Sequence, residues 1–241
     1  MMDTNYIIET KEVSFSYGHQ AVLRGINLQV PHNTIFGFLG PNGVGKSTTI
    51  KMLLGLIHDA QDRISIFGKS LLKHRIAILR QVGALIDEPT FYDHLSAREN
   101  LTVLATLVGV GHHRIDETLQ LVGLDADNRK KVKTYSVGMK QRLGLAIALL
   151  SDPPLLILDE PANGLDPHGI IELRKLLSTL QKEQGKTIFV SSHILDEVEK
   201  IATHIAIIYQ GQIRFQGSKE ELTRQAGSLE EAYLMMTTEP V

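Results

Sequence analysis

Apolar and polar residues alternate in short runs along the first part of this chain, as is typical of β-strands. We expect strands at residues 6–10, 12–17, 23–30 and 34–40. From Lys46 to Leu56 the spacing becomes helical, and Ile50, Leu53 and Leu54 fall on one face. The chain therefore begins as β-structure and turns helical directly after a glycine-rich segment.

The middle of the chain, from about 88 to 150, has mostly helical spacing, and strands alternate with helices after it. The helices predicted in the middle are 97–108, 115–122 and 137–150. The later strands are 155–158, 187–191 and 205–209, with helices at 168–183 and 195–202. Because Leu155–Leu158 is apolar throughout, it suits a parallel sheet that is covered on both faces.

These elements predict an α/β fold with a mainly parallel sheet, an antiparallel N-terminal β part and an inserted helical lobe. We expect a single domain over residues 1–241. Its parts are a core of 1–86 and 152–217, a helical lobe of 87–151 and a short helical tail of 218–241. Within the tail, residues 228–237 have an amphipathic pattern and are expected to pack on the core.

Composition narrows the function classes. The 241 residues are 43% hydrophobic and 22% charged, and the formal net charge of −2 provides no long-range attraction for nucleic acid. The chain contains no cysteine, which excludes disulfides and thiolate sites. The most apolar run, Leu143–Leu150, is far shorter than the roughly 18–20 residues of a membrane span, and we expect no secretory signal. If the protein acts at a membrane, another chain is expected to supply the membrane part.

A phosphate-binding loop is predicted between the apolar run 34–40 and the helical segment that follows. The motif G-x-x-x-x-G-K-[ST] is matched by Gly40, Pro41, Asn42, Gly43, Val44, Gly45, Lys46 and Ser47, with Thr48 next to it. Glycines let backbone N–H groups converge on phosphate oxygens. Lys46 is expected to reach the β- and γ-phosphates, and Ser47 to bind Mg²⁺. The alternative is a chance glycine-rich turn.

Two carboxylates follow the apolar strand 155–158. Ligands of α/β sheets bind at the carboxyl ends of strands, so we expect Asp159 to hold Mg²⁺ and Glu160 to orient or deprotonate the attacking water. The alternative is a helix cap or an exposed strand end. Together with the phosphate loop, this pair predicts a phosphate-loop NTPase core.

The segment 135–142 (Tyr-Ser-Val-Gly-Met-Lys-Gln-Arg) resembles the signature of ABC transporter ATP-binding subunits, usually Leu-Ser-Gly-Gly-Gln. Ser136 and Gly138 match it, whereas Tyr135, Val137 and Met139 depart from its commonest form. Ser136 is also a good N-cap for the predicted helix, so a plain capped core helix is the alternative. In the family this segment faces the γ-phosphate of another subunit. The resemblance therefore implies two composite sites in a head-to-tail dimer.

Further motifs occur in the order of the same family and cover nearly the whole chain. Tyr17 matches the aromatic residue that stacks on adenine, or is an ordinary strand tyrosine. Asp166 matches the loop that crosses the dimer interface, although Asp-Pro also suits a helix start. His193, after Ser191-Ser192, resembles the switch histidine that contacts the γ-phosphate. The resemblance implies catalytic roles for Glu160, His193 and Lys46.

One position departs from the family. Asp87 stands where these subunits usually carry glutamine, with Glu88 beside it. A carboxylate still offers oxygen to Mg²⁺ or water, but it adds negative charge near the triphosphate, so its role stays open. With residues 86–92 and Glu99-Asn100-Leu101, the departure resembles the bacitracin and lantibiotic self-protection branch. The cluster of Phe91, Tyr92 and Leu95 is either core or part of a groove for a permease helix.

The resemblance implies an ATPase that uses ATP and Mg²⁺ and powers export of a peptide antibiotic. Its expected partners are an integral-membrane permease and a second ATP-binding subunit, with no nucleic acid. It is expected at the cytoplasmic side of the cell membrane, held there through the permease. The alternatives are an exporter of drugs, lipids or ions, a soluble ABC ATPase of the iron–sulfur assembly type, and a regulatory protein that binds ATP without turnover.

Overall fold

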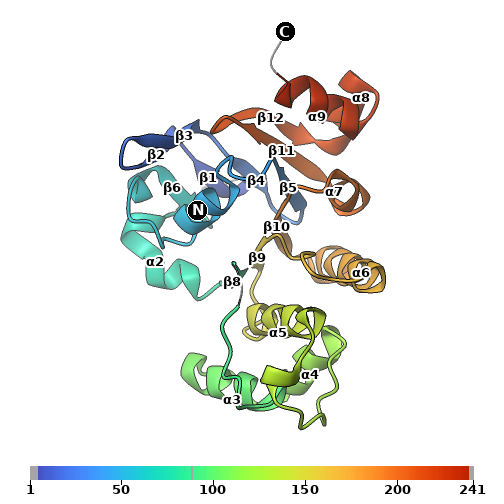
Figure 1. Ribbon diagram of the computed structural model, residues 1–241. Helices are drawn as coiled ribbons and strands as arrows, with labels where there is room; N and C mark the ends of the chain where they lie inside the picture. The colour runs from blue at the N-terminus through green and yellow to red at the C-terminus, as the bar shows by residue number, and fades with distance from the viewer. Residues whose placement is uncertain (1–4, 88, 239–241) are drawn as a thin grey trace.

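The computed structural model describes residues 5–87 and 89–238 (Figure 1). A six-stranded sheet in the order β12-β11-β5-β10-β9-β8 runs through its centre. The strands of this sheet are β5 (Ile35–Leu39), β8 (Val82–Leu85), β9 (Leu155–Asp159), β10 (Thr187–Ser192), β11 (His204–Tyr209) and β12 (Gln212–Ser218). All neighbours are parallel except β11 and β12. The predicted α/β fold with a mainly parallel sheet is confirmed.

Both faces of the central sheet are buried, as its apolar strands require. Every residue of β5, β9 and β10 is buried. One face, with Phe36 and Phe189, packs on α1 (Lys46–Leu53) and the N-terminal strands. The other face, with Leu156 and Val190, packs on the lobe and on α6 (Pro167–Gln184). Parallel strands enclosed in this way cannot tolerate polar side chains except at their ends, where the candidate site residues lie.

The N-terminal β part is antiparallel, as predicted. One sheet has the order β4-β1-β6-β7, and β2 pairs with β3. These elements are β1 (Tyr6–Thr10), β2 (Val13–Tyr17), β3 (Gln20–Ile26), β4 (Gln29–Pro31), β6 (Ile64–Ile66) and β7 (Lys69–Ser70). The prediction of one strand at 23–30 was wrong, because the chain changes sheets between β3 and β4. Asn27 Nδ2 donates to the Gly25 carbonyl at this turn, and Gly25 has a φ of +65°.

The lobe consists of α3 (Ala97–Val108), α4 (His113–Leu121), the 3₁₀ turn η2 (Val132–Thr134) and α5 (Val137–Leu149). All three helices predicted there are confirmed, with bounds that differ by at most two residues. The start of α3 follows from its sequence. Ser96 accepts from the Glu99 N–H, and the Glu99 carboxylate accepts from the Ser96 N–H. Such a capping box satisfies two backbone donors that the helix itself leaves unpaired.

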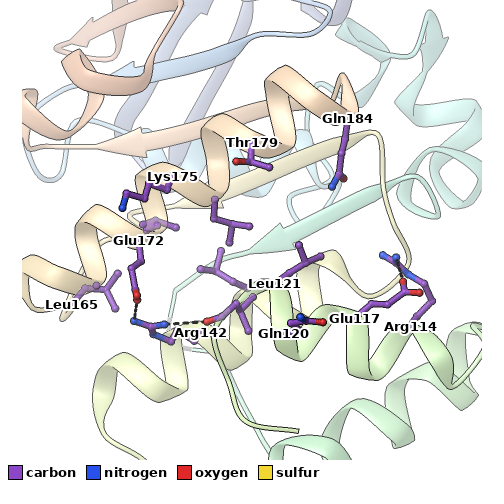
Figure 2. A pocket seen from close by; sticks show the side chains of 16 residues that line it. Arg114, Glu117, Gln120, Leu121, Arg142, Leu165, Glu172, Lys175, Thr179 and Gln184 are labelled. Atoms are coloured by element: carbon purple, nitrogen blue, oxygen red, sulfur yellow. Dashed lines mark hydrogen bonds and ion pairs between the residues drawn. The ribbon is translucent and has the colours of Figure 1, made fainter.

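Contacts of α5 attach the lobe to the core. Figure 2 shows the groove between α4, α5 and α6, where Arg142 of α5 pairs with Glu172 of α6 and donates to the Val122 carbonyl at 3.2 Å. On its other side, Gln141 Nε2 donates to the Pro161 carbonyl at 2.8 Å, directly after the acidic strand end. The lobe is therefore bound both to α6 and to the loop that carries Glu160.

Several short elements were not predicted: η1 (Gln61–Arg63), β6, β7, α2 (Leu71–Leu79), β8 and β12. The predicted helical tail begins with α8 (Lys219–Ala226). The remaining helices are α7 (Leu195–Ile201) and α9 (Leu229–Thr237). The amphipathic tail packs on the core as predicted, since Leu229 and Ala232 join the cluster of α7 and β11. In the described part of the chain, no helix has the length and apolarity needed to cross a membrane.

Gly83 lies where the lobe helix α5 comes closest to the sheet. A Cβ at this position would lie 2.0 Å from the Ala148 carbonyl oxygen and 2.8 Å from Pro153 Cγ. We therefore expect Gly83→Ala to lower the free energy of unfolding by about 1–3 kcal/mol, as overpacking does. Urea denaturation measures this. Gly138→Ala is the control, because its Cβ would meet Leu165 only at 3.6 Å. Equal stability of Gly83→Ala and the unaltered protein would contradict the prediction.

Candidate functional site

Three neighbouring strands of the central sheet end at one edge, and each is followed by polar residues of the predicted site. The phosphate loop follows β5, Asp159 and Glu160 stand at the end of β9, and His193 follows β10. Because β5 pairs with β10 and β10 with β9, all in parallel, these ends are adjacent. The topology thus brings together residues that are more than a hundred positions apart in sequence.

The phosphate loop curls tightly around its own lysine. Gly43 and Gly45 have φ values of +78° and +113°, which side chains disfavour. A Cβ on Gly40 would lie 2.6 Å from the Ile208 carbonyl oxygen, so the loop also needs glycine there for close packing. Gly45 is the N-cap of α1 and provides no side-chain cap. The first N–H groups of α1 thus remain oriented towards the loop, an arrangement that suits an anion.

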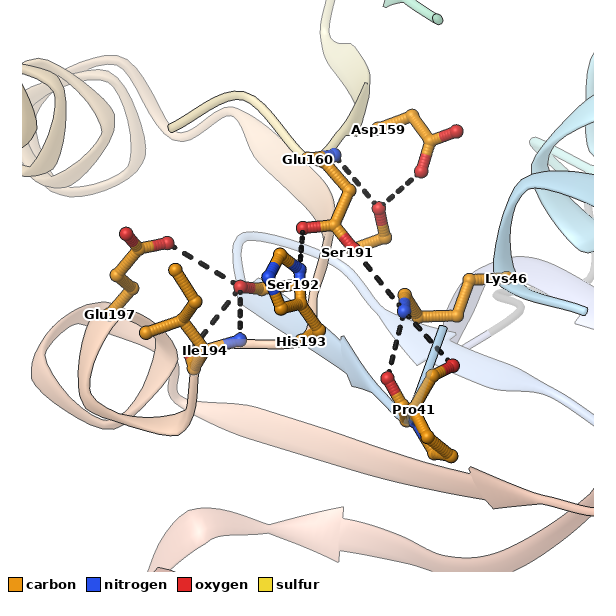
Figure 3. Close-up of polar contacts among 10 residues, drawn as sticks. Pro41, Lys46, Asp159, Glu160, Ser191, Ser192, His193, Ile194 and Glu197 are labelled. Carbon is orange, nitrogen blue, oxygen red and sulfur yellow. Dashed lines mark hydrogen bonds and ion pairs between the residues drawn. The ribbon is translucent and has the colours of Figure 1, made fainter. Parts of the chain in front are cut away.

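Lys46 and His193 hold Glu160 between them (Figure 3). Lys46 Nζ lies 3.2 Å from Glu160 Oε1, and His193 Nδ1 lies 2.8 Å from Glu160 Oε2. Lys46 is only 5% exposed, and its ammonium group also donates to the carbonyls of Gly40 at 2.8 Å and Pro41 at 3.3 Å. All three predicted catalytic side chains therefore meet in one hydrogen-bonded chain.

Ser191 joins the two acidic residues, and it was not among the predicted site residues. Its hydroxyl donates to Asp159 Oδ1 and accepts from the Glu160 N–H at 2.9 Å. Ser191 is fully buried, and Asp159 is 6% exposed. The φ of Glu160 is +48°, a conformation that non-glycine residues rarely adopt. Ser191 therefore stabilises the backbone turn between Asp159 and Glu160 by contacting both residues. A serine at a buried strand end, two residues before His193, was the available signal.

Ser192 fixes the backbone next to His193. Its hydroxyl accepts from the Ile194 N–H at 3.0 Å and lies 3.4 Å from Glu197 Oε2, as drawn in Figure 3. Burial raises the pKa of Glu197 above its ordinary value. The exposed His193 ring thus projects from a turn that is held on its buried side.

A cavity of about 390 Å³ lies over the phosphate loop. Its lining includes Tyr17, Asn42, Gly43, Gly45, Lys46, Ser47, Thr48, Glu160 and His193. Tyr17 is 56% exposed and stands edge-on to Phe15, with ring centroids 4.8 Å apart. An exposed ring at the rim of a phosphate cavity can stack on a flat base. Half of the predicted cofactor-binding residues therefore share one cavity.

The residues predicted to hold Mg²⁺, Ser47 and Asp159, line an adjoining cavity of about 720 Å³ together with Asp87 and Glu160. In the described residues there is no group of three or more His, Cys, Asp or Glu side chains arranged around a metal position. Two oxygen donors still fit Mg²⁺, because this ion keeps several waters and completes its shell with substrate phosphates.

Ser136, Gly138 and Asp166 lie apart from the phosphate cavity of their own chain and line another hollow of about 700 Å³. Ser136 caps α5 by accepting from the Met139 N–H at 3.2 Å. Asp166 caps α6 by accepting from the Gly169 N–H at 2.8 Å. The simple capping roles considered above are thus present in the structure.

Asp87 lies two residues after the end of β8, at the junction of core and lobe. Its Oδ2 lies 2.8 Å from Lys51 Nζ of α1, and this hydrogen bond raises the pKa of Lys51 above its ordinary value. Lys51 was not predicted as a site residue. Nothing in the local sequence pairs it with a residue thirty-six positions away. Glu88, which the sequence analysis placed beside Asp87, lies outside the described residues.

Comparison with known proteins agrees with this geometry. The family model described as ABC transporter matches residues 23–163. The chain is 49% identical to the bacitracin transport ATP-binding protein BcrA of Bacillus licheniformis, over 86% of this chain and 68% of that protein. It is 43% identical to the lantibiotic transport ATP-binding protein SrtF of Streptococcus pyogenes, over 86% of this chain and 89% of that protein.

A solved structure of an ATP-binding subunit of an ABC transporter superposes with a TM-score of 0.85 at 32% identity, over 96% of this chain and 100% of that one. The family match extends from β3 to the residues after Glu160. It therefore includes Lys46 and the acidic strand end, which meet in the structure. The chain belongs to the ABC transporter family and is one of its ATP-binding ATPases.

Proposed function

We propose that this ATPase drives export of a peptide antibiotic through a separate membrane permease, as a self-protection or resistance system. The observation that carries the cargo assignment is its likeness to two relatives named for bacitracin and lantibiotic transport. The acidic residue at position 87, in place of the family's usual glutamine, agrees with this branch. The proposal places the protein at the cytoplasmic side of the membrane, bound to its permease.

The contacts of Glu160 support its role as the base of hydrolysis. Lys46 Nζ pairs with the Glu160 carboxylate at 3.2 Å. We infer that incoming β- and γ-phosphates take over the lysine, which leaves the carboxylate next to the attacking water. Glu160 then accepts a proton from water as the new O–P bond forms and the bond to the leaving ADP oxygen breaks. His193, which lies against the same carboxylate, would donate to the γ-phosphate.

Mg²⁺, held by Ser47 and Asp159, would neutralise charge on the transferred phosphoryl group. In this proposal the Tyr17 ring, at the edge of the cavity, stacks on the adenine base. The backbone amides of residues 40–48 surround the phosphates. Ser191 keeps Asp159 turned towards the cavity through its hydroxyl. Of these side chains, Tyr17, Ser47 and Asp159 line the two adjoining cavities.

The distance of Ser136, Gly138 and Asp166 from their own phosphate cavity supports a head-to-tail dimer. In such a dimer the capped start of α5 would meet the γ-phosphate bound by the partner, because helix N-termini favour anions. Ser136 is exposed, so its helix start is accessible to a second subunit. Each of the two sites would then combine the phosphate loop of one chain with the signature of the other.

The segment after Asp87 is the proposed contact with the permease. Phe91 packs against the lobe core, whereas Tyr92 is 49% exposed. Asn100 holds this segment by accepting from the Tyr92 N–H at 2.9 Å. The cluster is thus divided between core packing and an exposed surface. Because it follows the Lys51–Asp87 contact, movement at the nucleotide site can be passed to a bound permease helix.

The cargo assignment is tested by resistance. Deleting the gene in its own cells should lower the concentration of bacitracin or of a lantibiotic that stops growth, and returning the unaltered gene should restore it. A gene carrying Lys46→Met should fail to restore resistance, whereas the exposed control Lys182→Met should restore it fully. Unchanged sensitivity to these antibiotics, with altered sensitivity to a drug or an ion, would assign the protein to another exporter class.

A further inference from the structure

An ion pair links the phosphate-loop helix to the junction with the lobe. Lys51 lies on α1, one turn after Ser47, and its ammonium group is 2.8 Å from the Asp87 carboxylate. The Lys51 and Asp87 side chains are 33% and 60% exposed, so both are partly solvated. A neutral glutamine at position 87 would not require such a partner. The contact thus accompanies the departure of this chain from the usual family residue.

The carboxylates and lysines around the proposed triphosphate position explain why Asp87 needs a cationic partner. Three carboxylates, those of Asp87, Asp159 and Glu160, line the cavity of about 720 Å³ in which the γ-phosphate and metal would lie. Lys46 neutralises Glu160, and Lys140 lines the same cavity from α5. A further unpaired carboxylate would repel the triphosphate by Coulomb interaction. Lys51 is the lysine in contact with Asp87, the carboxylate that stands in place of the glutamine expected from the family resemblance.

We propose that Lys51 is a positioning residue of the nucleotide site, which neutralises Asp87 and so allows a carboxylate to replace glutamine beside the triphosphate. This inference rests on the proposed role of the site in binding ATP. It predicts that the two residues have opposite effects on an anionic ligand. It also predicts that each effect depends on the presence of the other residue.

Binding of a fluorescent ATP analogue without metal, in EDTA, measures this balance. Lys51→Met exposes the Asp87 charge and should weaken binding by about 3–10-fold, while Asp87→Asn frees the Lys51 charge and should strengthen it by a similar factor. The double variant should bind within about twofold of the unaltered protein. Asn keeps the shape of Asp and suits the φ of +48° at this position. Thermal unfolding verifies that each variant is folded.

Two further measurements distinguish a charge effect from a purely structural role of Lys51: the dependence of binding on ionic strength and the affinity for Mg²⁺. The differences in metal-free binding should shrink towards unity in about 0.5 M salt, since screening weakens interactions between partly exposed charges. The two substitutions should have the opposite effects on the binding of a cation. Lys51→Met should lower the Mg²⁺ concentration that half-saturates the nucleotide-bound protein, and Asp87→Asn should raise it.

Two results would overturn the inference while leaving ATP binding intact. One is that Lys51→Met and Asp87→Asn change metal-free affinity in the same direction, and the other is that neither changes it. If the unaltered protein fails to bind the ATP analogue with or without Mg²⁺, the proposed function fails and the inference fails with it. The experiment therefore separates an error in the charge pair from an error in the site.

Discussion

Glu160→Gln is expected to lower steady-state ATP hydrolysis by about 10²–10⁴-fold, the usual contribution of a general base. Glutamine keeps the size and polarity of the side chain but cannot accept the proton of the attacking water. The change also removes the charge that pairs with Lys46 at 3.2 Å. Lys46 is thereby more available to phosphate, so ATP binding should persist. Phosphate release and binding of an ATP analogue measure the two properties separately.

The slow variant also tests the composite site. With hydrolysis blocked, ATP should accumulate between two chains, and sedimentation in ATP and Mg²⁺ should show a dimer. Adding Ser136→Glu to Glu160→Gln should abolish this dimer, because a carboxylate would face the partner's γ-phosphate. Ser136→Thr keeps the N-cap hydroxyl and is the control for helix stability. Hydrolysis by Glu160→Gln at the rate of the unaltered protein would remove the base assignment.

Lys46→Met should weaken ATP binding by about 10–100-fold, since hydrogen bonds to charged groups contribute about 1.5–3 kcal/mol each. Methionine fills a similar volume but removes a buried ammonium group that contacts two loop carbonyls and Glu160. Without it, Glu160 keeps His193 as a partner and adds uncompensated negative charge to the cavity. Titration with a fluorescent ATP analogue measures the loss.

The matched control for Lys46→Met is Lys182→Met on α6. Lys182 is exposed and lies near the far end of its helix, so the control removes the same charge away from the site. It should leave the affinity for ATP within about twofold of the unaltered value, because solvent screens distant charges. Equal affinities of Lys46→Met and Lys182→Met would contradict the placement of the phosphates in the loop.

Much of the core could be predicted because its signals are local. The short apolar run Leu155–Leu158 is typical of a strand buried on both faces of a parallel sheet, and Ser96 with Glu99 forms the capping box at the start of α3. The glycines of the phosphate loop likewise indicate a backbone with positive φ values, which Gly43 and Gly45 adopt. Local chemistry therefore located the loop, the acidic strand end and the helices of the lobe.

Other features depend on tertiary contacts that leave little trace in local sequence. The break between β3 and β4 arises because the two strands join different sheets, although residues 23–30 alternate like one strand. The short strands β6 and β7 take their shape from pairing with β1 and with each other. The pairing of Lys51 with Asp87 likewise requires the three-dimensional approach of α1 to the end of β8.

The most direct test of a transport role is capture of the tagged protein from detergent-solubilised membranes of its own cells, with partners identified by mass spectrometry. We predict recovery of a multi-span permease together with the ATPase, and loss of that permease when the exposed Tyr92 is replaced by aspartate. Reproducible recovery of soluble scaffold proteins alone, from a preparation that still hydrolyses ATP, would contradict the transporter account and favour an ATPase of the iron–sulfur assembly type.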